Sequence, residues 1–187
     1  MSITIFERRE RAFEAVFFAR LDEQRIARLR EKLREAHQME RLTHSTGISN
    51  PAVLRRILDL GVQAENLQAL TLVPLVITAW AGGEVTPAER DAALIAAERE
   101  GVSRESGAHH LLECWLDEAP PPELEETWRD YVRALLEQLD DEHASALKQD
   151  LLSRCRQVAR ASGGFLGVAK VSGDEADAIR RIEEAMG

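Results

Sequence analysis

The fold is decided by residues 67–101, which read LQALTLVPLVITAWAGGEVTPAERDAALIAAEREG. From Leu67 to Ala81 the chain is almost entirely apolar, and Leu67, Leu70 and Ile77 recur at helical steps over a length that exceeds an ordinary strand. Apolar residues occupy the other faces as well, which is typical of a helix enclosed by others. A membrane span needs about 20 apolar residues, and this run is shorter. The pattern predicts a buried central helix over residues 67–81.

A specific turn follows this helix. Gly82 is expected to adopt the left-handed conformation that closes a helix. Thr86 is predicted to cap the next helix, with Pro87 at its first position and Glu89 reaching back to the Thr86 amide as a capping box. The second helix is expected to end near Gly101.

Length and composition limit the class of protein. The 187 residues suit one domain, or one domain with an appendage. A net charge of −9 argues against nucleic acid as a principal partner, because phosphate binding needs clustered cations. Cys114 and Cys155 are far apart and are predicted to be buried thiols in a reducing compartment. Charges near the N-terminus do not suit a signal peptide, so a cytoplasmic protein is expected.

The first 41 residues form a different kind of segment. They hold 10 basic and 8 acidic residues, whereas the rest of the chain holds 14 basic and 25 acidic residues. Residues 4–42 lack Gly and Pro and are rich in helix formers. We therefore predict a helical arm over residues 1–44 and a helical domain over residues 45–187.

The arm carries two apolar stripes that do not align on one straight helix, so a bend or break is predicted near Leu21 and Asp22. One stripe comprises Phe6, Phe13, Phe17 and Leu21, and the other comprises Ile26, Leu29, Leu33 and Ala36. Such an arm is expected to pack on its own domain, on a protein partner or on a second copy. Peripheral association with a membrane surface is the alternative, which the many glutamates weaken.

The rest of the chain also reads as helical. Helices are predicted after caps at Asn50, Ser103 and Ser172, and over residues 123–139 and 141–161. Residues 165–168, which read FLGV, are expected to thread beneath neighbouring helices. Because no alternating run of strand length occurs, the predicted fold class is all-α.

Two turns share one design, and here a family resemblance appears. Residues 79–90, AWAGGEVTPAER, and residues 170–175, KVSGDE, resemble the two turns of the TerB-like tellurite-resistance domain. In that family an alanine-rich helix ends in an Ala-Asp-Gly-type turn, followed by a hydroxyl residue and by a Glu three positions on. The resemblance covers about residues 52–187. It implies a compact all-helical bundle linked to stress or metal-ion resistance and found with membrane-associated assemblies.

The same resemblance implies a divalent-metal surface built from acidic residues of the two turns, which here are Glu84, Glu89, Asp174 and Glu175. This sequence departs from the family pattern, with Gly82 in place of the usual Asp and Lys170 in the second turn. Ca²⁺ and Mg²⁺ prefer about six oxygen ligands, and two of the four carboxylates are expected to serve as caps. Capping is therefore favoured over metal binding.

A second resemblance lies in the arm. Residues 6–17, FERRERAFEAVF, are similar to the opening of the zeta inhibitor subunit of bacterial F-type ATP synthases. In that family a helical N-terminal segment inserts into the catalytic head and blocks rotation. This implies, as an alternative, a regulator of ATP synthase.

Other candidate chemistry is sparse. His109 with Glu113, and His110 with Cys114, lie one helical turn apart, and such pairs can bind Zn²⁺. No matching pair stands elsewhere at ligand spacing, and Cys114 beside Trp115 is expected to face the core, so a structural role is favoured. Because neither a Gly-rich phosphate loop nor a Ser/His/Asp set is present, we expect a non-enzymatic interaction or scaffold protein.

Overall fold

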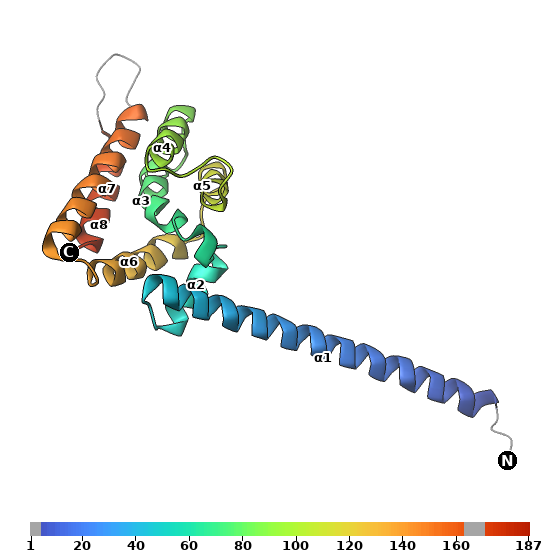
Figure 1. Ribbon diagram of the computed structural model, residues 1–187. Helices are drawn as coiled ribbons and strands as arrows, with labels where there is room; N and C mark the ends of the chain where they lie inside the picture. The colour runs from blue at the N-terminus through green and yellow to red at the C-terminus, as the bar shows by residue number, and fades with distance from the viewer. Residues whose placement is uncertain (1–4, 163–170) are drawn as a thin grey trace. The chain divides into compact units, whose positions relative to one another are not determined.

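The computed structural model describes the backbone of residues 5–162 and 171–187, and the side chains of residues 17–161 and 171–187. The predicted threading of residues 165–168 lies outside the described residues. Within them every regular element is a helix and no strand occurs, so the all-α prediction is confirmed (Figure 1). The helices are α1 (Ile5–Thr46), α2 (Pro51–Asp59), α3 (Ala69–Ala79), α4 (Pro87–Arg99), α5 (Gly107–Asp117), α6 (Glu123–Leu136), α7 (Asp141–Ser162) and α8 (Gly173–Ala185), with a 3₁₀ turn at Ala64–Asn66.

The chain divides into two units, residues 1–40 and residues 41–187. Helix α1 is continuous through Leu21 and Asp22, so the predicted break there is wrong. The two apolar stripes instead lie on different faces of one helix, because Phe17 and Leu29 are separated by about 120° at 100° per residue. The side chains of Phe6 and Phe13 lie outside the described part.

Helix α3 is the centre of the second unit. It packs against α4, α5, α6, α7 and α8, and all of its residues except Thr71 are buried. The predicted central helix is confirmed but is shorter than residues 67–81. Its C-terminal end is fixed at Trp80, whose indole nitrogen donates a hydrogen bond to the Trp115 carbonyl oxygen at 2.8 Å.

The turn after α3 corrects one prediction. The left-handed residue is Gly83, with φ of 88°, and not Gly82. The last turn of the helix tightens, with the Ala81 amide donating to Thr78 and the Gly83 amide donating to Trp80 three residues back. This tightening moves the reversal one residue further along the chain, to a position where only Gly avoids steric strain.

Ion pairs join the helices around this core. Arg56 of α2 bonds to Glu126 at 2.8 Å and to Asp130, both on α6. Arg154 of α7 is buried and lies 3.3 Å from Glu100, the C-cap residue that follows α4. None of the helices, over their described residues, is long and apolar enough to cross a membrane.

Candidate functional site

The turn before α4 forms the predicted capping box. The Thr86 amide and hydroxyl donate to one carboxylate oxygen of Glu89, at 2.8 and 2.7 Å. The Glu89 amide donates back to the Thr86 hydroxyl oxygen at 3.3 Å. Glu89 is only 5% exposed, whereas Glu84 in the same turn is exposed. The Glu89 carboxylate is therefore engaged by its own helix terminus.

The turn before α8 repeats this arrangement. The Ser172 amide donates to the Glu175 carboxylate at 2.6 Å, and the Glu175 amide donates to the Ser172 hydroxyl oxygen at 3.2 Å. Glu175 is 3% exposed, and Asp174 is exposed. The shared design of the two turns is confirmed as helix capping.

The predicted metal set, Glu84, Glu89, Asp174 and Glu175, is not gathered into one ligand cluster. Among the described residues, the one group of three or more His, Cys, Asp or Glu side chains at metal-ligand spacing lies on α5 instead. A metal at the four turn carboxylates stays a prediction.

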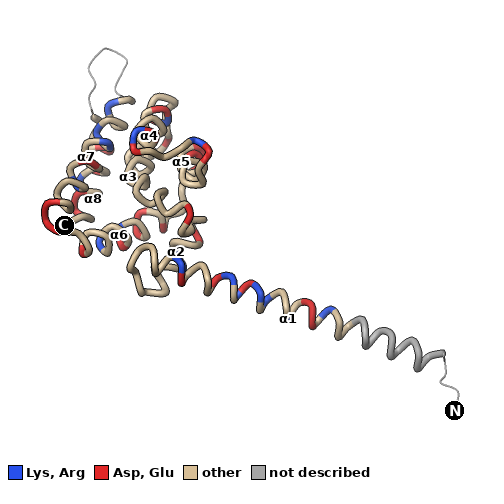
Figure 2. Tube along the Cα trace, in the orientation of Figure 1, with Lys and Arg blue, Asp and Glu red and all other residues tan. Residues whose placement is uncertain are grey.

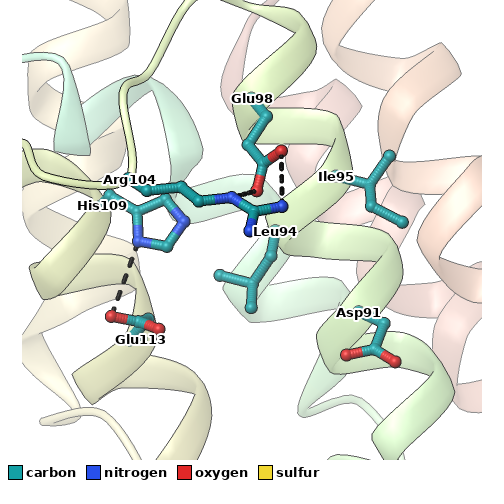
Figure 3. Close-up of a pocket in the computed structure, with 7 residues that line it drawn as sticks. All are labelled: Asp91, Leu94, Ile95, Glu98, Arg104, His109 and Glu113. Carbon is teal, nitrogen blue, oxygen red and sulfur yellow. Dashed lines mark hydrogen bonds and ion pairs between the residues drawn. The ribbon is translucent and has the colours of Figure 1, made fainter.

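A cavity of about 400 Å³ opens between α4 and α5 (Figure 3). Glu98 of α4 and Arg104 of the following loop form a two-pronged ion pair on its wall, at 2.6 and 3.1 Å. This hydrogen bond lowers the pKa of Glu98 and raises the pKa of Arg104. The pair could not be predicted from the sequence, because a loop separates the two residues.

His109 enters this cavity from α5. The helix is capped by Ser106, whose hydroxyl accepts from the His109 amide at 3.1 Å, so the predicted cap at Ser103 is wrong. His109 is 5% exposed, and neither of its ring nitrogens has a hydrogen-bond partner. Its Nδ1 lies 3.5 Å from the Glu113 carboxylate, within ion-pair range but without hydrogen-bond geometry.

The neighbouring residues complete the local arrangement. His110 Nδ1 also lies 3.5 Å from Glu113 Oε2. Cys114 is exposed, which corrects the prediction that it faces the core, whereas Cys155 is buried as predicted. Burial raises the pKa of the Cys155 thiol to about 11. The structure therefore groups His110 with Glu113 and does not place Cys114 in that cluster.

A second kind of site is the apolar surface of α1. The exposed large hydrophobic side chains in the described chain are concentrated on this helix: Phe17, Phe18, Ile26, Leu29 and Leu33. Outside α1 this set contains only Ile95, on α4. Basic residues recur along the same helix with acidic residues between them (Figure 2), and residues 25–34 hold five basic residues and one acidic residue. The exposed apolar surface is therefore contiguous with a positively charged segment.

Comparisons with family models, curated proteins and solved structures found no match. The resemblance to the TerB-like domain accordingly rests on the two capped turns alone. What the structure establishes is an all-helical fold. The segment that resembles the zeta inhibitor subunit lies outside the described side chains except at Phe17.

Proposed function

We propose that this protein is a non-enzymatic interaction protein that associates with a second copy of itself through one face of α1. The observation that carries the proposal is the exposure of Phe18, Ile26, Leu29 and Leu33, which ranges from 48% to 62%. Soluble proteins seldom leave contiguous apolar patches in water, and larger patches mark interaction sites.

The spacing of these residues suits helix pairing. At about 100° per residue, Phe18, Ile26, Leu29 and Leu33 fall within an arc of about 80°. Ile26, Leu29, Leu33 and Ala36 follow the alternating three- and four-residue steps of a coiled-coil seam. The seam covers about two heptads, so the expected association is reversible and dependent on concentration.

The distribution of exposed apolar side chains favours α1 of a second copy as the partner of this face. In the described residues, the bundle exposes Ile95 as its single large hydrophobic side chain, so it offers no apolar counterpart to the α1 face. The corresponding face of a second α1 supplies that counterpart. Because residues 25–34 are predominantly basic, two such helices repel each other, and salt should strengthen the association by screening this repulsion.

The test is light scattering coupled to size exclusion, on the full chain over a range of concentrations. The wild-type protein should shift from monomer to dimer as concentration rises. The double substitution Leu29→Glu and Leu33→Glu should leave it monomeric, because it places charges in the seam. The matched control, Gln24→Glu with Ala27→Glu, adds the same charge on the opposite side of α1 and should still dimerise.

A wild-type protein that stays monomeric at every concentration would contradict the proposal. So would a dimer that persists in the seam variant or weakens as salt is added. Weakening of the dimer as salt is added would indicate that the basic helix binds an acidic surface.

The TerB-like assignment for residues 52–187 is a second proposal, supported by two capping boxes of one design before α4 and α8. It includes a role in stress or metal-ion resistance through the turn carboxylates. If that role is present, Ca²⁺ or Mg²⁺ must raise the thermal stability of the folded protein, because a ligand that prefers the folded state stabilises it.

A further inference from the structure

One turn of α5 gathers three metal-ligating side chains. The ligand atoms of His109, His110 and Glu113 all lie within 4.8 Å of one another. The two Nδ1 atoms each stand 3.5 Å from the same carboxylate oxygen of Glu113. Zinc binds imidazole nitrogen and carboxylate oxygen at about 2.0–2.2 Å in a tetrahedral arrangement, so its ligands sit about 3.3–3.5 Å apart. The two nitrogen–oxygen separations match that spacing, and the remaining pair of ligand atoms lies within 4.8 Å.

His109 gives an independent indication of a ligand. It is 5% exposed and lines the cavity between α4 and α5, yet both ring nitrogens lack a hydrogen-bond partner. Buried polar groups in native proteins are nearly always paired. An ion bound at Nδ1 would provide the partner that no protein atom supplies to that nitrogen.

The surroundings orient Glu113 toward the two imidazoles. Arg90 of α4 lies 3.8 Å from the other carboxylate oxygen of Glu113, Oε1. Arg90 is itself held by Asp117 through a hydrogen bond of 2.7 Å. This leaves Oε2 facing His109 and His110, in the manner of an outer-shell interaction that positions a metal ligand. Figure 3 shows Glu113 below His109 on the wall of the cavity.

We propose that His109, His110 and Glu113 bind a divalent transition-metal ion of the zinc class. Two imidazoles and one carboxylate favour Zn²⁺ over Ca²⁺ or Mg²⁺, which prefer all-oxygen sites. Three protein ligands leave a fourth position for water. The His110 side chain is 66% exposed, which gives the ion a path from solvent. This site is separate from the turn carboxylates and does not depend on the association of α1.

The experiment is calorimetric titration of the tag-free full chain with Zn²⁺ alone, and a parallel titration with Co²⁺ followed by its visible absorption. We expect one ion per chain and the spectrum of a nitrogen- and oxygen-ligated Co²⁺ without a thiolate band. His110→Ala and Glu113→Gln should each weaken binding at least tenfold.

Three controls distinguish binding at this site from nonspecific metal binding elsewhere on the protein. His110 is exposed, so His110→Ala should keep the thermal stability of the wild-type protein in the presence of a chelator. Cys114→Ser removes the exposed thiol next to Glu113 and should leave Zn²⁺ affinity unchanged. His143→Ala removes another exposed His that pairs with a carboxylate, Asp140, at 2.7 Å, and should also bind normally.

Three results would overturn the proposal. One is the absence of Zn²⁺ and Co²⁺ binding by the folded wild-type protein. Another is unchanged affinity in both His110→Ala and Glu113→Gln. The third is loss of the ion in Cys114→Ser or His143→Ala, since it would place the metal on other residues.

Discussion

The capping box at the start of α4 allows a sharp test of what Glu89 does. In the structure Glu89 is buried and its carboxylate accepts two hydrogen bonds from Thr86. Glu89→Ala leaves the partly buried Thr86 amide without an acceptor, which costs about 1–3 kcal/mol. Thr86→Ala removes the cap itself and costs about 0.5–2 kcal/mol. We therefore expect a loss of about 2 kcal/mol for Glu89→Ala and about 1 kcal/mol for Thr86→Ala.

Glu89→Gln distinguishes a cap from a metal ligand. A Gln side chain also closes a capping box, so this variant should lose less than about 1 kcal/mol. A hard metal ion would instead lose a charged ligand in Glu89→Gln. Exposed Glu84→Ala is the matched control and should stay within about 0.5 kcal/mol of the wild-type protein.

The assay is urea unfolding of each variant in the presence of a chelator, repeated with Ca²⁺ and with Mg²⁺. A loss of about 2 kcal/mol corresponds to a fall in Tm of about 4–8 °C for a chain of this size. The double variant Thr86→Ala with Glu89→Ala should show a coupling energy of about 1 kcal/mol, because the two residues act as one unit. Equal losses of unfolding free energy in Glu89→Ala and Glu84→Ala would refute a capping role for Glu89. So would losses that appear only when metal is present.

Three further predictions concern the core, the thiols and the pH dependence. Leu72→Ala, at a fully buried position of α3, should lower the free energy of unfolding by about 2–5 kcal/mol; a loss below about 1 kcal/mol would contradict the central place of α3. At pH 8, titration with dithiobis(nitrobenzoate) should find one fast thiol, Cys114, and a second only after unfolding, because Cys155 is buried with a pKa of about 11. The hydrogen bond from Arg90 lowers the pKa of Asp117 below its ordinary value of 3.8. The stabilisation by this hydrogen bond is fully present above the ordinary pKa of Asp117 and is lost as the pH falls through the lowered pKa. In Asp117→Asn, the free energy of unfolding should therefore fall less steeply as the pH is lowered through this acid range.

Local signals in the sequence account for the parts of the fold that could be predicted. A capping box involves residues three apart, so Thr86 with Glu89 and Ser172 with Glu175 could be recognised without any tertiary information. The apolar run of α3 indicated an enclosed helix because all of its faces are apolar.

The predictions for the cap of α5 and for the burial of Cys114 were wrong because both features depend on how neighbouring helices pack. Ser103 and Ser106 both precede α5 at cap spacing, and neither has a Glu or Gln three residues later to decide between them. Cys114 adjoins Trp115, but a helix turns by about 100° per residue, so burial of Trp115 does not bury Cys114.

The candidate site on α5 could be predicted only in part. The spacing of His109, His110 and Glu113 was visible in the sequence. Which of two adjacent histidines enters the interior depends on how α5 rotates against α4, and the sequence alone does not fix that rotation. The orientation of Glu113 by Arg90 likewise requires the packing of α4 beside α5.

The most direct test of the proposed α1 association is a disulfide cross-link between two copies of the chain. Leu29→Cys, made in a Cys114→Ser background, places a thiol near the middle of the apolar stripe. Ala27→Cys in the same background places it about 160° away on α1. Under mild oxidation we predict rapid formation of a covalent dimer by Leu29→Cys and little by Ala27→Cys, because two thiols must bring their Cβ atoms to about 3.5–4.5 Å. Equal cross-linking by the two variants, or none by either, would contradict association through this face.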